Sequence, residues 1–221
     1  CVYNYKEDSK KNLLDLIDSA GIARTEVFAG DYLDEPQITI ISPTRDFYES
    51  LLPKFRNKLN FHWALEALEE NSYSSKDDIS DETTLSKTLD DATDDTSAHN
   101  QSSIVFLLET DEKQKFLFTG DAGRDAFNHV PQTLLGKVKD VTWMKVPHHG
   151  SKHNLDSTII KHVNPEIAYI STEKQGKYLN RSTVFALKKN GTKVYSTSQN
   201  RSTIRHGAIK TREGWTKIEP M

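Results

Sequence analysis

Two short motifs contain side chains that could bind a metal ion, and each follows an apolar run. The first is Phe116-Leu-Phe-Thr-Gly-Asp121, which ends on a carboxylate. The second is Lys145-Val-Pro-His-His-Gly-Ser151, in which His148 and His149 precede a glycine. Neutral imidazole and carboxylate are ordinary ligands of zinc and manganese. Because α/β folds place their sites beyond the ends of strands, the sequence predicts a metal site built from Asp121, His148 and His149.

Each motif also has an ordinary structural interpretation. A single Thr-Gly-Asp sequence is most often a turn, and a His-His pair is more often a hydrogen-bonded polar pair than a set of ligands. The four-residue spacing of His149 and His153 is that of zinc ligands on a helix, but Gly150 disfavours a helix there. Both motifs together, in this order, are much less expected by chance, which favours the metal site.

The elements predicted around these motifs alternate between strand and helix. Apolar runs bounded by turn residues predict strands over 103–109, 115–120, 140–147, 167–171 and 193–197. Helical spacing predicts helices over 123–135, 155–163 and 182–189. The first two strands should form a hairpin, and the rest is typical of a layered α/β fold. A last pair of segments, 202–209 and 214–218, is predicted to be antiparallel.

The first seventy residues are less regular. They predict a helix over 10–20, short strands over 25–29 and 37–42, and a longer helix over 46–70. Gly21 is a stop signal for the first helix. Pro53 must kink or interrupt the longer one.

Residues 71–100 differ in composition from the rest. Eight acidic residues and two lysines lie between Lys76 and His99, with few large apolar side chains among them. Such a segment cannot offset its ordering entropy by burial. We therefore predict an acidic flexible insert over 71–100 that is dispensable for folding.

Length and composition limit the possible classes of protein. A chain of 221 residues suits one domain, so 1–221 is predicted to be a single domain. No run approaches the roughly 18–20 apolar residues that span a bilayer. The single cysteine, Cys1, excludes an internal disulfide framework. No signal-peptide pattern is present, so the expected location is the cytoplasm, and the missing initial Met indicates a mature product or a fragment.

The charge of the chain is unevenly distributed. The formal net charge is −3, yet from Gly136 to the end there are sixteen basic and six acidic residues. A basic region of this kind points weakly to an anionic substrate or partner, although a solvated basic surface is the more common explanation.

The second half of the chain resembles the metallo-β-lactamase-fold hydrolases. The resemblance runs through Ser102-Ser-Ile-Val-Phe-Leu-Leu-Glu109, Phe116-Leu-Phe-Thr-Gly-Asp-Ala-Gly123, Val141-Thr-Trp-Met-Lys-Val-Pro-His-His-Gly-Ser-Lys152, Asn164-Pro-Glu-Ile-Ala-Tyr-Ile-Ser171 and Leu187 to Thr197. It covers roughly residues 100–210 and is strongest to the soluble domain of ComEC-type competence proteins. It implies an αββα sandwich with mixed sheets flanked by helices, of which this chain holds a part.

The same resemblance implies roles for the residues of the two motifs. Asp121 corresponds to a carboxylate that bridges two divalent metal ions, and the His148-His149 pair supplies a further ligand. Which of the two histidines binds metal stays open. A bridged pair of ions would generate hydroxide near neutral pH and hold the oxygens of a phosphodiester.

The chain departs from the family at its main metal-binding signature, His-x-His-x-Asp-His. None of the eight histidines are spaced His-x-His, and the later His-Pro-Ser motif is replaced by Leu179-Asn-Arg-Ser182. Three protein ligands are usual for catalytic zinc. The chain therefore resembles the carboxy-terminal half of a hydrolase, or a degenerate member. We expect it to bind zinc, or alternatively manganese, weakly and to have negligible activity alone.

Taken together, these patterns predict a metal-dependent hydrolase in the intact protein, acting on a phosphodiester. The basic second half favours nucleic acid, because phosphate contacts supply most non-specific affinity. The alternative is a non-catalytic half-domain that binds a protein partner or nucleic acid. Half a sandwich leaves an apolar sheet surface and an unpaired edge, so we expect a dimer or the missing amino-terminal half to cover it.

Overall fold

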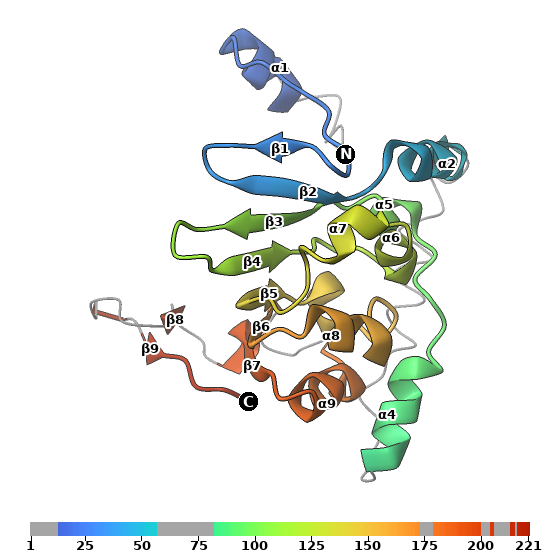
Figure 1. Ribbon diagram of the computed structural model, residues 1–221, viewed down its shortest axis with the longest axis vertical. Helices are drawn as coiled ribbons and strands as arrows, with labels where there is room; N and C mark the ends of the chain where they lie inside the picture. The colour runs from blue at the N-terminus through green and yellow to red at the C-terminus, as the bar shows by residue number, and fades with distance from the viewer. Residues whose placement is uncertain (1–12, 57–81, 173–178, 200–203, 206–212, 215) are drawn as a thin grey trace.

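A computed structural model describes residues 13–56, 82–172, 179–199, 204–205, 213–214 and 216–221. Its centre is a seven-stranded sheet in the order β1 to β7, beside a two-stranded ribbon of β8 and β9 (Figure 1). The large sheet consists of β1 (Tyr32–Leu33), β2 (Ile38–Ser42), β3 (Val105–Glu109), β4 (Lys115–Phe118), β5 (Trp143–Lys145), β6 (Ile167–Ile170) and β7 (Lys193–Ser196). The ribbon consists of β8 (Ile204–Arg205) and β9 (Thr216–Lys217).

The large sheet is antiparallel in its first half and parallel in its second. Strands β1 to β4 pair antiparallel, and β3 and β4 form a hairpin with Glu109 opposite Lys115. Strands β4 to β7 pair parallel, and each step between them needs a crossover. The crossovers contain α6 (Arg124–Asn128) and α7 (Gln132–Leu135), then α8 (Ser157–Val163), then α9 (Arg181–Lys189).

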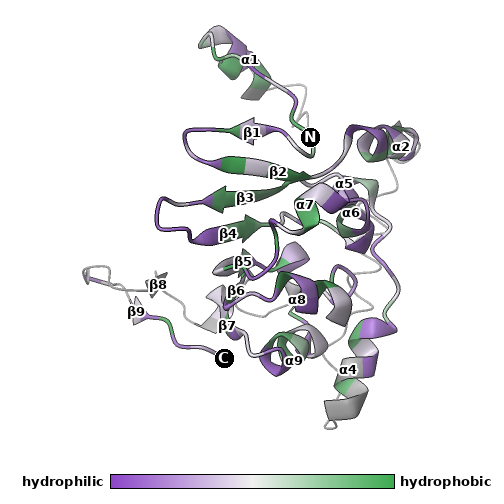
Figure 2. Ribbon diagram, viewed as in Figure 1, coloured by the Kyte–Doolittle hydropathy of each residue, from purple (hydrophilic) through white to green (hydrophobic). Residues whose placement is uncertain are grey.

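The core lies between the sheet and these crossover helices. Each of the strands β3 to β7 contributes a fully or nearly fully buried residue on this side: Leu107, Leu117, Met144, Ala168 and Val194. Helix residues Ile160 and Leu187 belong to the same cluster. Figure 2 shows hydrophobic residues along the central strands and a hydrophilic turn in the β3–β4 hairpin. This pattern is what alternation along half-buried strands requires.

The intervening strand residues carry a row of aromatic rings. Phe106, Phe118, Trp143, Tyr169 and Tyr195 follow one another across five strands, with successive centroids 4.7, 5.1, 5.6 and 5.2 Å apart. Burial, together with the neighbouring Tyr195, raises the pKa of Tyr169 to about 12. Ring packing of this kind stabilises cross-strand pairs.

The predicted fold class, an α/β protein with a mixed sheet flanked by helices, is confirmed. The helix α1 (Leu13–Ser19) and the predicted strands from 37 onward also lie where expected. The longer helix is α2 (Arg45–Arg56), with Pro53 inside it, and its predicted remainder to 70 lies outside the described residues. Among the described helices, none is long and apolar enough to cross a membrane.

Three local predictions differ from the structure. Residues 25–28 form no strand, and the chain instead turns at 29–30 before β1. The predicted helix 123–135 is divided into α6 and α7, because Pro131 cannot continue a helical hydrogen-bond ladder. Strands β8 and β9 pair parallel rather than antiparallel.

The acidic segment also differs from its prediction. Residues 71–81 lie outside the described part, but α4 (Glu82–Asp90) and α5 (Ala98–Gln101) are helical. Leu89 is fully buried in the main core cluster. Residues 82–90 and 98–100 of the predicted flexible insert are therefore helical, and its dispensability for folding stays a prediction. The buried side chain of Leu89 anchors α4 to the core although the segment is polar overall.

Candidate functional site

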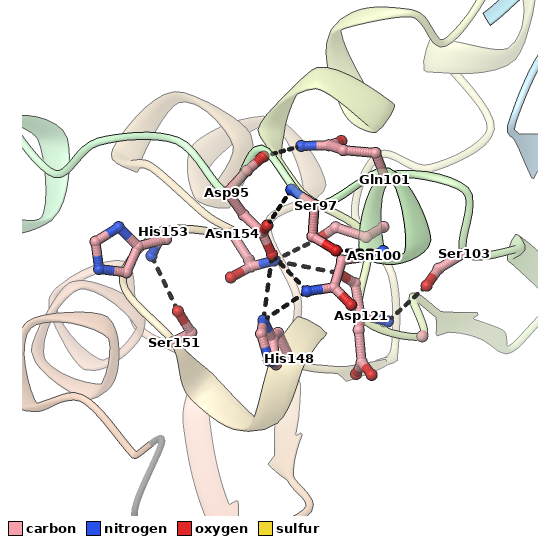
Figure 3. Close-up of polar contacts among 12 residues, drawn as sticks. Asp95, Ser97, Asn100, Gln101, Ser103, Asp121, His148, Ser151, His153 and Asn154 are labelled. Carbon is pink, nitrogen blue, oxygen red and sulfur yellow. Dashed lines mark hydrogen bonds and ion pairs between the residues drawn. The ribbon is translucent and has the colours of Figure 1, made fainter. Parts of the chain in front are cut away.

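The two predicted motifs meet at the carboxyl ends of β4 and β5. These strands are parallel neighbours, with Phe116 paired to Trp143. Asp121 follows β4 after a turn, and the 3₁₀ turn η1 (Pro147–Gly150) follows β5. The backbone N–H of His148 donates to the carbonyl oxygen of Gly120, 3.3 Å away. The carboxylate motif and the histidine motif thus share one edge of the sheet (Figure 3).

The backbone of η1 separates the two histidines. His148, His149 and Gly150 have φ values of +42°, +55° and +89° in succession. Two consecutive non-glycine residues in the left-handed region are strained, a condition that clusters at functional sites. The ring of His149 contacts the carbonyl oxygen of Ser171 through Nδ1. The centroids of the His148 and His149 rings lie 6.0 Å apart and the rings are inclined by 64°.

The ring of His148 contacts a carboxylate from the acidic segment. Its Nδ1 lies 3.3 Å from Oδ2 of Asp95. The same Oδ2 accepts from Asn100 at 2.8 Å and from Asn154 at 2.9 Å, while Oδ1 accepts from the Ser97 backbone N–H at 2.8 Å. The side chains are largely buried, with 10% of Asp95 and 22% of His148 exposed.

The two members of this pair have oppositely shifted pKa values. Burial alone would raise the pKa of Asp95, but the hydrogen bonds it accepts outweigh burial and lower that pKa. Burial alone would lower the pKa of His148, but the hydrogen bond and charge of Asp95, with the charge of Asp121, raise it. Both shifts favour the ionised form of the pair, in which a carboxylate faces an imidazolium.

Asp121 has a cationic neighbour of its own. Lys145, the last residue of β5, places Nζ 3.4 Å from Asp121 Oδ1 and also donates to the carbonyl oxygen of Gly120. Ser103 Oγ accepts from the Asp121 backbone N–H at 3.1 Å. The Asp121 side chain is 40% exposed, so its carboxylate remains accessible to solvent.

The described residues do not by themselves fit a metal centre. Among them, no group of three or more His, Cys, Asp or Glu side chains is arranged to hold an ion. Asp121 pairs with Lys145, His148 Nδ1 contacts Asp95, and the His149 ring turns to Ser171. His153 Nδ1 contacts the carbonyl oxygen of Thr93 at 2.6 Å, so it does not form a helical pair with His149.

Four residues of this site were not predicted from the sequence: Asp95, Asn100, Lys145 and Asn154. Lys145 stood within a predicted motif, and its place at the end of an apolar strand was a usable signal. The other three reach the site through long-range packing. Asn154 is fully buried and also donates to the carbonyl oxygen of Asp121, 3.1 Å away, which ties the carboxylate motif to the loop after η1.

Gly123 gives a prediction about the packing that supports the site. A Cβ built there would lie 2.2 Å from Nε2 of Gln101, a buried side chain that donates to the Asp95 carbonyl oxygen and accepts from the Ala126 N–H. We expect Gly123→Ala to lower the free energy of unfolding by about 1–3 kcal/mol through overpacking.

Gly136→Ala is the matched control for that substitution. No atom lies within 4 Å of a Cβ at 136, and its φ of −62° suits alanine. This variant should be neutral or more stable by up to about 1 kcal/mol. Chemical denaturation of both variants provides the comparison, and equal stabilities would contradict the packing described at Gln101.

Comparison with known proteins gives one informative similarity. No family model matches the chain, and no solved structure matches it. The chain is 30% identical over 128 residues to ComE operon protein 3 of Bacillus subtilis (strain 168). The aligned part is 57% of this chain and 16% of that protein, so the chain spans a small share of its relative's length. The resemblance to ComEC-type competence proteins is thereby supported over that part. The metallo-β-lactamase fold stays a prediction.

Proposed function

We propose that this chain forms one side of a hydrolytic site for phosphodiester bonds in nucleic acid. The observation that carries the proposal is the convergence of Asp121 and His148 at the ends of two parallel neighbouring strands, joined by the bond from His148 N–H to Gly120. The sequence resemblance and the partial similarity to a competence-operon protein support nucleic acid as the substrate class.

The charges at this edge suit an anionic substrate. Lys145 Nζ lies 3.4 Å from Asp121 Oδ1, and the charges of Asp95 and Asp121 raise the pKa of His148 and so favour its cationic form. Cationic donors stabilise the charge that develops on phosphate oxygens during transfer. An imidazole held against a carboxylate is also a suitable general acid for the oxygen that leaves, because the hydrogen bond and charge of Asp95 raise its pKa and favour the protonated ring. These two roles belong to side chains of this chain, whereas the other side of the site would come from the rest of the intact protein.

The predicted zinc or manganese ion remains part of the proposal only for the intact protein. The described residues offer too few donors, so an ion would need donors from elsewhere in that protein. We therefore expect the 221-residue chain alone to bind zinc and manganese weakly and to cleave DNA negligibly.

A second candidate function is binding of nucleic acid without cleavage. It is favoured by the contact between Lys145 and Asp121, because a lysine ammonium already occupies the carboxylate that a metal would use. Under this alternative the chain binds DNA in a salt-dependent manner, and the complete gene product does not hydrolyse it.

The test compares two histidines within the complete product of the gene that encodes this chain. Cleavage of single-stranded DNA and of a generic phosphodiester is measured with zinc and with manganese. Loss of a general acid costs typically about 10²–10⁴-fold in rate, so His148→Ala should lose at least about 100-fold. His149→Ala should lose less, because its ring contacts Ser171 instead of the Asp95 carboxylate.

Asp121→Ala should reduce cleavage at least as much as His148→Ala. Calorimetry of the chain alone with zinc and with manganese completes the test. Absence of cleavage by the complete product would reject the hydrolytic function, and equal cleavage by the wild type and the His148→Ala variant would reject the role given to His148. Tight stoichiometric metal binding by the chain alone would show that a ligand set has been missed.

A further inference from the structure

Asp95 is held in place by more contacts than a surface carboxylate normally makes. Its two oxygens accept four hydrogen bonds, from the Ser97 backbone, Asn100, Asn154 and His148. Its own carbonyl oxygen accepts from the buried Gln101 side chain. A carboxylate with this many donors, and with only 10% of its side chain exposed, has a fixed orientation.

The segment around Asp95 is anchored on both sides. On one side, the buried guanidinium of Arg124 donates to the carbonyl oxygens of Leu89 and Ala92 and pairs with Asp94. On the other, Ser97 caps α5 by accepting from the Asn100 N–H. The turn that contains Asp95 is therefore held on both sides by hydrogen bonds, and it places the Asp95 carboxylate at the edge of the sheet.

The chemistry of the contact decides which ring nitrogen of His148 carries the proton. An ionised carboxylate can only accept hydrogen bonds, so Nδ1 of His148 must be the donor to Asp95 Oδ2. The Asn100 amide, 3.5 Å from Nδ1, donates instead to Oδ2 at 2.8 Å, which satisfies both groups. With Nδ1 protonated, Nε2 is the ring nitrogen that can exchange a proton with a substrate.

We propose that Asp95 is a positioning residue for His148, and that the acidic segment is part of the site because it supplies this carboxylate. The role rests on the proposed function, since it deepens the account of the same hydrolytic site. Asp95 acts through the imidazole: it fixes the orientation of the ring and its Nδ1–H tautomer, as a carboxylate behind a functional histidine commonly does. It does not itself contact the substrate.

The tautomer of His148 provides a direct readout. The full chain is labelled with ¹⁵N in histidine, and ring nitrogens are observed by NMR without metal or substrate, at a pH where the imidazoles are neutral. The His148 signals are assigned from a His148→Gln variant. In the wild type we expect the Nδ1–H tautomer to predominate. A hydrogen bond to a charged acceptor is strong enough that Asp95→Ala should change the tautomer ratio by roughly tenfold or more toward Nε2–H.

Two further variants make the result specific. Asp95→Asn keeps an oxygen that can accept from Nδ1–H but lacks the charge, so it should shift the ratio less than alanine, by roughly threefold. This variant also serves if Asp95→Ala does not fold. Asp91→Asn removes the same charge from an exposed position in the same segment and should leave the ratio unchanged.

The outcomes separate this inference from the proposed function. A shift in both Asp95 variants but not in Asp91→Asn supports the positioning role, even if the complete gene product cleaves no DNA and the hydrolytic function is rejected. An unchanged tautomer ratio in folded Asp95→Asn, with cleavage by the wild-type product intact, overturns the positioning role and leaves the hydrolytic function standing.

Discussion

Replacing Arg124 with methionine is expected to lower the free energy of unfolding by about 3 kcal/mol or more. Arg124 begins α6 and is nearly fully buried, a rare position for an arginine unless it is fully paired. Its guanidinium donates, at 2.7 to 3.1 Å, to the carbonyl oxygens of Leu89, Ala92, Lys152 and Leu155. Methionine fills much of the same volume but leaves these buried acceptors without donors.

Two controls separate the carbonyl bonds from the ion pair. Asp94 lies 2.9 Å from Arg124 Nη1, but its side chain is 42% exposed, so Asp94→Asn should cost less than about 1 kcal/mol. Arg124→Lys keeps the positive charge, but its ammonium group lacks the planar fork of donors that reaches four carbonyl oxygens. The free energy of unfolding should therefore fall by an amount between those of Asp94→Asn and Arg124→Met. Urea denaturation of the three variants gives the comparison. A loss below about 1 kcal/mol in Arg124→Met would mean that water replaces the guanidinium without cost.

The part of the site that could be predicted from the sequence is the part that depends on local pattern. An apolar strand followed by Gly-Asp, and another followed by Pro-His-His, place polar side chains at strand ends. The parallel pairing of β4 and β5 then brings Asp121 and His148 to one edge. Sequence pattern could not separate His148 from His149, because that separation comes from two consecutive left-handed residues in η1.

The part that could not be predicted depends on contacts between distant segments. Asp95 lies among other acidic residues, and nothing in its local sequence distinguishes it from exposed Asp91. It reaches His148 because Leu89 is buried and Arg124 binds the carbonyl groups of the same segment. The prediction of a flexible insert rests on the average hydrophobicity of the segment. One buried leucine and one buried arginine from another element outweigh that average.

A second substitution tests this view of the acidic segment as a whole. Replacing residues 85–96 with a Gly-Ser linker of equal length should lower the free energy of unfolding by at least about 4 kcal/mol. Loss of a fully buried leucine such as Leu89 alone costs about 2–5 kcal/mol. The linker also removes the Asp90 carboxylate, which accepts from the Ser157 N–H and Oγ at 2.8 Å each. Because chain length is unchanged, loop-closure entropy contributes little to the difference.

The linker variant is measured by chemical denaturation beside Asp91→Asn, which neutralises an exposed charge in the same segment and should change stability by less than about 0.5 kcal/mol. Combining the linker with Arg124→Met should cost less than the sum of the two separate losses, because both disrupt the contacts of Arg124 with Leu89, Ala92 and Asp94. A loss below about 2 kcal/mol in the linker variant would show that the segment is dispensable, as its composition predicts. Full additivity with Arg124→Met would show that Arg124 stabilises the fold without holding this segment.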